Sequence, residues 1–345
     1  MPEFKSRPSP SQVLKMATVA PSAEGALRSP PEPPAPLQQP EREFTVEART
    51  QRQMVMRRFV RHRLAMAGLV VFLLILLAST VGARLWKYSY NDILPKPDPR
   101  GAPTLDVIPW LDGDGLAWGE HPFGQDNVGH DHLARTLRGA QKSIQIALIV
   151  ALVATAIGTT IGAAAGYFGG RVDTTLMRFT DVVLTIPLLV VAAALGRSLE
   201  GGPFALAFVL GVLTWTSLAR VIRSDFLSLR EKEFVEAARA VGVPDRRIIV
   251  KHMLPNSIGL IIVNATLAVA TAVLLETALS FLGFGVRPPD TSLGQIVSEY
   301  QNAFSTRPWL FWWPGVFIIA IALSINFIGD GLRDAFDPKQ NRVRA

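Results

Sequence analysis

The side chains best suited to chemistry in this sequence lie in two short clusters. His130-Asp131-His132 supplies two imidazoles and a carboxylate, which are common ligands of transition metals. Neighbouring residues rarely converge on one ion, however, and Asp131 is explained as a residue that begins a helix. Asp112 and Asp114, each followed by glycine, have the spacing of the first ligands of a calcium loop, but the later ligands are missing, which favours a pair of turns. We therefore expect no metal site.

Other motifs of catalysis are absent from the sequence. It contains no Gly-x-x-x-x-Gly-Lys-Ser/Thr phosphate loop and no His-Glu-x-x-His zinc motif, so we expect neither ATP hydrolysis by this chain alone nor metalloprotease activity. It contains no cysteine, which excludes a disulfide, a thiolate metal site and a cysteine nucleophile. We expect no enzyme activity and no cofactor in this chain.

The elements that would position any functional side chain are mainly apolar segments. The chain has 345 residues, of which 49% are hydrophobic and 18% are charged, and this balance indicates a membrane protein. A helix needs about 20 apolar residues to cross the hydrocarbon layer of a membrane, and six segments approach that length. We therefore expect an all-α membrane protein with six transmembrane helices at Leu64–Ala83, Ile144–Tyr167, Val182–Gly196, Pro203–Ala219, Ile258–Phe281 and Phe311–Ile328.

Basic residues set the expected orientation of these spans. The Arg-rich flank before Leu64, the loop Arg220–His252 and the tail Arg333–Arg344 fall on one side, which the positive-inside rule assigns to the cytoplasm. The chain is then a multi-pass protein whose two termini face the cytoplasm. These loops and anionic membrane lipid explain the net charge of +7, so we expect no nucleic-acid partner.

The spans divide the chain into parts. Residues 1–45 are Pro-rich and are expected to form a disordered cytoplasmic tail, and residues 46–63 mix apolar side chains with arginine as an amphipathic interfacial segment does. Residues 64–345 are the expected transmembrane domain. Within it, residues 84–143 form an extracytoplasmic region of no assigned fold, and residues 220–256 form a cytoplasmic loop.

That cytoplasmic loop has the most distinctive spacing in the chain. Residues from about 224 to 241 favour a helix, which Gly242 ends in a left-handed conformation and Pro244 prevents from continuing. Asp245 is expected to cap a second helix through Ile249. The product is a short, rigid helical elbow.

The elbow presents small and charged side chains that suit a partner surface. Ala237 and Ala238 allow close approach to the helix backbone, and Glu233, Glu236 and Arg239 offer charge partners at its rim. We interpret it as the place where a membrane subunit grips a soluble motor. The alternative is an ordinary solvated amphipathic loop.

The spacing of residues in this loop also resembles that of a known protein family. The order Glu236-Ala237-Ala238, three residues, Gly242 and then Leu254-Pro255-Asn256 resembles the cytoplasmic coupling loop of bacterial ABC importer permeases. Over roughly residues 55–340 the chain is similar to the peptide/nickel branch of that family, although His130 stands where arginine is usual. Three further stretches carry the similarity: His121-Pro-Phe-Gly124-Gln-Asp126, Glu276-Thr-Ala-Leu-Ser280-Phe-Leu-Gly283 and Gly329-Asp330-Gly331-Leu-Arg333-Asp334.

The resemblance implies a fold, a set of partners and a cargo. The fold is that of a type I ABC importer permease with six spans in the bacterial inner membrane. The implied partners are a homologous second permease subunit, two ATPase subunits that bind ATP and Mg, and an extracytoplasmic peptide-binding protein. The residues that would couple to the ATPase subunits are Glu233, Glu236, Ala237, Ala238, Arg239, Gly242, Leu254 and Pro255.

The implied cargo is a dipeptide or oligopeptide, and a nickel chelate or another small solute is the alternative within the same class. A motor-independent channel or carrier also explains the spans, but it leaves the elbow unused. A membrane receptor or scaffold whose loop docks a signalling protein is a third class.

Three polar residues inside the expected spans are candidates for a translocation path. A carboxylate in the bilayer is costly when it faces lipid, so Glu276 is expected to face a cavity, a partner or an interface. It either attracts the terminal amine of a peptide or makes a structural hydrogen bond to the following turn. Asn264 and Asn326 either line the path or make interhelical hydrogen bonds.

Glycines recur every fourth residue in the second expected span. Gly158, Gly162, Gly166 and Gly170 would form a smooth strip on one face of a helix, where another helix backbone can approach closely. The neighbour is either a span of the same subunit or a sister permease.

Overall fold

The structure, a computed structural model, describes residues 51–95, 101–105, 119–198 and 202–337, all of which belong to the compact unit Arg49–Ala345. The predicted tail at residues 1–45 and the Asp-Gly pair at 112–115 lie outside the described residues. Within the described residues the regular structure is helical, and the pairing of Gln125 with Asp131 is an isolated bridge. The expectation of an all-α protein is confirmed.

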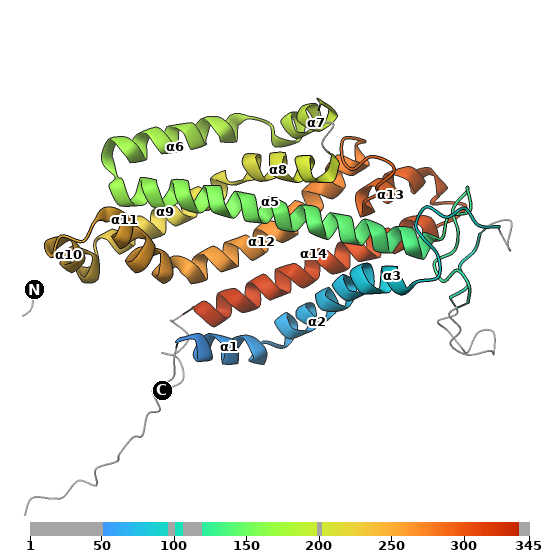
Figure 1. The fold of residues 1–345 in the computed structure, drawn as a ribbon, viewed down its shortest axis with the longest axis horizontal. Coiled ribbons are helices and arrows are strands. Elements are labelled where there is room, and N and C mark those ends of the chain that lie inside the picture. The colour runs from blue at the N-terminus through green and yellow to red at the C-terminus, as the bar shows by residue number, and fades with distance from the viewer. Residues whose placement is uncertain (1–50, 96–100, 106–118, 199–201, 338–345) are drawn as a thin grey trace, which may run out of the picture. The chain divides into compact units, whose positions relative to one another are not determined.

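Figure 1 shows how these helices are arranged. In chain order the α-helices are α1 (Gln51–Arg61), α2 (Arg63–Leu77), α3 (Ala83–Leu85), α5 (His132–Phe168), α6 (Gly170–Thr185), α7 (Leu188–Ser198), α8 (Gly202–Thr214), α9 (Thr216–Arg230), α10 (Glu233–Ala240), α11 (Asp245–Arg247), α12 (Leu254–Phe281), α13 (Leu293–Tyr300) and α14 (Trp309–Phe336). Two π-helical segments, η2 (Ala78–Gly82) and η3 (Ile248–Met253), and one short 3₁₀ helix, η4 (Gln301–Ala303), complete the set.

Four of the described helical segments are long and apolar enough to cross a membrane by themselves. They are Arg63–Leu85, His132–Phe168, Asp245–Phe281 and Trp309–Phe336. The first of them exposes large apolar side chains such as Leu74, which is 59% exposed. Such a surface is costly in water and is compatible with the hydrocarbon of a bilayer.

The third and fourth expected spans are bent helix pairs. Helices α6 and α7 meet at 78°, and α8 and α9 meet at 44°, so the structure has up to six spans when each pair counts as one. The first bend lies at Ile186 and Pro187, because proline lacks an N–H and its ring disfavours helical backbone in the preceding residue. Ile186 accordingly has extended backbone, with φ −79° and ψ 124°. The expected spans at 182–196 and 203–219 thus each fall on a bent helix pair.

The boundary of the second expected span also needs correction. Helix α5 begins at His132 rather than at Ile144 and has 37 residues. Its N-terminal turns therefore lie within residues 84–143, the predicted extracytoplasmic region. These turns contain charged residues, so they are not part of an apolar run and the span was predicted to begin later. The predicted helix start at Asp131 is correct.

Helix α5 is the centre of the packing. It lies along α9, α8 and α12, and α14 packs against both α12 and α2. The core between them consists of apolar side chains such as Ile144, Leu210, Val273 and Ile321. This arrangement holds one end of α5 beside the α10 turn and the other beside α13.

Candidate functional site

The predicted coupling helix is α10, and it is shorter than the sequence indicated. A continuous helix was expected over residues 224–241, but the chain breaks between α9 and α10 at Glu231 and Lys232. The predicted ending is confirmed. Gly242 has a φ of 75°, its N–H donates to the carbonyl of Arg239 at 2.9 Å, and the N–H of Val243 donates to that of Ala238 at 3.0 Å.

Of the adjacent alanines Ala237 and Ala238 on α10, only Ala237 faces outward. Val235 and Ala238 are buried against the rest of the chain, so the expectation that both alanines are open to a partner was wrong for Ala238. Ala237 is exposed together with the carboxylates of Glu233 and Glu236. The outer face of α10 is therefore acidic, with a small residue at its centre.

Two large apolar side chains extend this outer face. Phe234 is 39% exposed and Val241 is 78% exposed, although both lie on a short helix that is otherwise polar on this side. Apolar side chains beside carboxylates make a surface that suits a protein partner better than water alone. We refer below to Glu233, Phe234, Glu236, Ala237 and Val241 as the outer face of α10.

The segment after Gly242 differs from its prediction. Pro244, and not Asp245, is the residue before α11, and the helix does not stop at Ile249. It continues through η3 and α12 as one helical segment from Asp245 to Phe281. Leu254 packs partly buried against the core beneath α10, and Pro255 is exposed at the second residue of α12, directly after η3.

An apolar cluster joins α10 to the spans. Val235 and Ala238 of α10 share it with Ile222 and Phe226 of α9 and with Ile248 of η3. Tyr167, near the end of α5, belongs to the same cluster and is 4% exposed. Helix α10 thus contacts the ends of several long helices at once.

The glycine strip on α5 packs within the same chain. A Cβ atom added at Gly158 would lie 2.8 Å from the carbonyl oxygen of Trp215, and one added at Gly162 would lie 2.5 Å from that of Ala219. At Gly166 it would lie 2.5 Å from Cβ of Phe226. The neighbour is therefore α9 of the same subunit, and the prediction of a same-subunit contact is confirmed.

Gly170 is not part of the strip. It begins α6, has a φ of 50°, and has no neighbour within 4 Å of an added Cβ atom. The fourth-residue repeat ends with α5, because the chain leaves the helix at Gly169.

Glu276 makes structural hydrogen bonds in this structure. The hydroxyl of Ser143 donates to its Oε2 at 2.8 Å, and the hydroxyl of Ser280 donates to its Oε1 at 2.6 Å. The side chain has no exposed surface. This geometry supports the structural alternative, since Glu276 joins α5 to the last turn of α12 and its carboxylate is fully buried.

The two asparagines make no interhelical hydrogen bond among those described. Asn264 donates to the carbonyl of Leu260 at 2.8 Å, within its own helix. Asn326 is half-buried in α14. A role for either residue in a translocation path stays a prediction.

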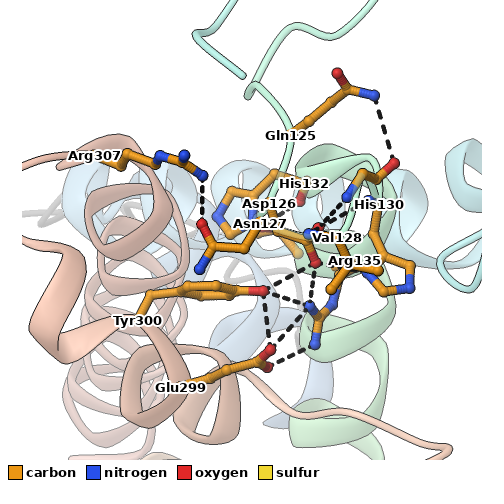
Figure 2. Close-up of polar contacts among 12 residues, drawn as sticks. Gln125, Asp126, Asn127, Val128, His130, His132, Arg135, Glu299, Tyr300 and Arg307 are labelled. Carbon is orange, nitrogen blue, oxygen red and sulfur yellow. Dashed lines mark hydrogen bonds and ion pairs between the residues drawn. The ribbon is translucent and has the colours of Figure 1, made fainter. Parts of the chain in front are cut away.

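A second polar cluster, at the other end of α5, was not predicted. Figure 2 shows that the carboxylate of Asp126 accepts hydrogen bonds from the chain around it and from two helices. Its Oδ1 accepts from the N–H groups of Val128, Gly129 and His130 at 2.8 to 2.9 Å. Its Oδ2 accepts from Arg135 at 2.8 Å and from the hydroxyl of Tyr300 at 3.0 Å.

These bonds determine the protonation of Asp126. Burial alone would raise the pKa of the Asp126 carboxyl, but the hydrogen bonds from the ring and N–H of His130 and from the N–H of Gly129 outweigh it and hold the pKa well below its usual range. Arg135 also binds Glu299, at 2.7 Å. We call Asp126, His130, Arg135, Glu299 and Tyr300 the Asp126 clamp, because they join the segment before α5 to α13.

The histidines near this clamp are engaged separately and do not converge. His130 contacts Asp126 through Nδ1 at 2.6 Å, and His132 lies edge-on to Tyr300 at 5.8 Å between ring centroids. Asp131 caps α5 by accepting from the N–H of Ala134 at 2.7 Å, as expected. No three His, Asp or Glu side chains in the described part of the chain are grouped as metal ligands.

Two further basic residues near the start of α5 bind one carboxylate. Arg138 and Lys142 contact Asp290 at 2.6 and 2.8 Å. Burial would raise the pKa of the Asp290 carboxyl, but these two cations outweigh it and lower the pKa. The positive charges of Arg135, Arg138 and Lys142 are therefore paired with carboxylates of the same chain.

Comparisons with known proteins agree with this architecture. A family model described as "Binding-protein-dependent transport system inner membrane component" matches residues 158–342, and a second, described as "N-terminal TM domain of oligopeptide transport permease C", matches residues 50–103. An inward-facing methionine ABC transporter, MetNI, is similar with a TM-score of 0.47 and 23% identity over 59% of this chain and 97% of that chain.

Curated relatives are similar over most of their length. The oligopeptide transport system permease protein OppC of Mycobacterium tuberculosis is 39% identical over 300 residues, which cover 86% of this chain and 98% of the relative. OppC of Escherichia coli is 37% identical over 295 residues, which cover 85% and 93%.

The described residues form four helices long and apolar enough to cross a membrane, or up to six with the two bent pairs, which is the architecture of a multi-pass helical membrane protein, and both family models describe transport components. The chain belongs to the family of binding-protein-dependent transport system inner membrane components. Its curated relatives are permeases, and the prediction of an ABC importer permease is confirmed.

Proposed function

We propose that the chain is the permease subunit of an ATP-driven importer of peptides. Its relatives are named as oligopeptide permeases and are similar over 85% or more of this chain, which supports a dipeptide or oligopeptide cargo. A nickel chelate or another small solute is the second candidate within the same class. ATP and Mg belong to separate ATPase subunits, and an extracytoplasmic binding protein delivers the cargo.

The outer face of α10 is the observation that carries this proposal. It presents Glu233, Glu236 and exposed apolar side chains, whereas the inner face of the same helix is fixed to the spans through Val235 and Ala238. A motor-independent channel has no use for such a helix. We infer that each permease of a pair binds one ATPase subunit through this face.

The proposed mechanism follows from how α10 is attached. ATP binding closes the ATPase pair and moves α10, and the apolar cluster beneath it moves the ends of α5, α9 and α12 together. The spans then exchange between inward-open and outward-open arrangements, and both termini of the chain face the cytoplasm. Residues of this chain transmit force and perform no covalent step.

Charge reversal on the outer face tests the proposal. Glu236→Lys is expected to reduce ATP-dependent uptake of a labelled oligopeptide by at least about tenfold in membrane vesicles, because a like-charge contact at an interface costs several kcal/mol. The variant is expected to remain inserted at normal levels, since Glu236 is exposed. ATPase subunits are expected to co-purify with the parent chain and poorly with the variant.

Arg171→Glu is the matched control, because Arg171 is also exposed and lies in the first turn of α6, away from α10. Its uptake is expected to stay near that of the parent. Full uptake in Glu236→Lys, or uptake that needs no ATP, would favour a channel or carrier. Transport of nickel chelates in place of peptides would keep the coupling mechanism and replace the cargo.

A further inference from the structure

Tyr167 contacts both sides of the turn that follows α10. Its hydroxyl donates to Oδ1 of Asp245 at 2.6 Å, and the guanidinium carbon of Arg239 lies 4.9 Å from the centre of its ring. Arg239 is in the last turn of α10, and Asp245 is the first residue of α11. One side chain of α5 therefore bridges the two helices that meet at Gly242.

We propose that Tyr167, through Arg239 and Asp245, fixes the angle between α10 and α11 and so makes α5 move with the coupling helix. This inference rests on the proposed function, and it assigns to Tyr167 a positioning role within the importer. The sequence predicted that Arg239 contacts a partner. In the structure its guanidinium group lies against the Tyr167 ring of the same chain.

The need for such a bond follows from the turn itself. Gly242 has no neighbour within 4 Å of an added Cβ atom, so packing does not restrain the turn at that point. The apolar contacts beneath α10 hold it against the spans but are non-directional, so they do not fix its angle to α11. A short hydrogen bond to a carboxylate and an arginine over an aromatic face both have preferred geometry, and they restrain the turn on both sides.

Tyr167→Phe isolates the bond, because phenylalanine keeps the ring beneath Arg239 and removes only the hydroxyl. In the complete importer, reconstituted in proteoliposomes, we expect peptide taken up per ATP hydrolysed to fall by about tenfold, the typical effect of losing a hydrogen bond to a charged group. ATPase subunits are expected to co-purify normally, since the outer face of α10 is unchanged. Asp245→Ala is expected to give the same loss, and the double variant no further loss.

Tyr90→Phe is the matched control. The guanidinium carbon of Arg138 lies 4.9 Å from the centre of the Tyr90 ring, the same distance as that of Arg239 from the centre of the Tyr167 ring. Tyr90, however, contacts the other end of α5. Its uptake per ATP is expected to equal that of the parent. An unchanged ratio in Tyr167→Phe would overturn the inference.

A second measurement separates this inference from the proposed function. Because the chain contains no cysteine, Val241→Cys and Leu152→Cys place two spin labels specifically on α10 and α5. We expect a narrow distance distribution in the parent and a broad one in Tyr167→Phe. A broad distribution together with no ATP-driven peptide uptake by the parent would reject the proposed function and keep the bond, whereas equal distributions would reject the bond.

Discussion

At the scale of single residues, the Asp126 carboxylate is the most heavily bonded group described at the end of α5 opposite α10. Both of its oxygens accept from several donors, which come from its own segment, from α5 and from α13. The charged form of this carboxylate is favoured, because protonation would weaken the hydrogen bonds that its donors make to it. Its contribution to stability must therefore depend on pH.

The sign of that dependence follows from the lowered pKa of Asp126. The contribution is complete above the carboxyl's ordinary pKa of about 4 and is lost as the pH falls toward the pKa of the folded state. At pH 7 we expect Asp126→Asn to lower the free energy of unfolding by about 3 kcal/mol. The difference between variant and parent should shrink below a pH of about 4, in melting curves measured in mild detergent.

Asp92→Asn is the control for this prediction, because Asp92 is an exposed carboxylate that accepts from the N–H of Ser89 at 2.7 Å. The amide oxygen of asparagine can accept the same bond, so little change in melting is expected at any pH. Equal destabilisation by both variants would show that the Asp126 clamp is not specific.

At the scale of elements, the glycine strip of α5 permits backbone contact with α9. We expect Gly162→Ala to destabilise the protein by about 1 to 3 kcal/mol, because the added methyl group meets a carbonyl oxygen that cannot move away alone. Gly315→Ala in α14 is the matched control for Gly162→Ala, since no atom lies within 4 Å of the Cβ atom added at Gly315. It should be neutral or stabilising by up to about 1 kcal/mol, as alanine favours a helix over glycine. Equal melting temperatures for the two variants would contradict this.

The same elements show what the sequence could predict. Hydrophobic runs predicted the straight spans, and the spacing around Gly242 predicted the end of α10, because both depend on residues close in the chain. The Asp126 clamp was missed because Tyr300 is 174 residues from Asp126. The burial of Ala238 was missed for a related reason, since a short helix has little periodicity from which to identify its inner face.

At the scale of the whole molecule, the orientation of the chain can be tested with single thiols. The chain has no native cysteine, so one introduced cysteine is the only thiol present. We expect Val241→Cys to resist a membrane-impermeant maleimide in intact cells and to react in inverted vesicles from cells that lack the ATPase subunits, which would otherwise cover this face. Ile93→Cys, at the other end of the bundle and also exposed, is expected to show the opposite pattern. The reverse result for both positions would invert the proposed orientation.

The unbroken length of α5 has a mechanical consequence. A helix of 37 residues is about 55 Å long, and it carries the Asp126 clamp before its first turn and Tyr167 in its last. Because polar bonds hold it at both ends, we expect α5 to move as one rigid helix. A tilt of about 5° at one end displaces the other by about 5 Å over this length. We therefore expect small movements at the two ends of α5 to be coupled to one another through this single helix.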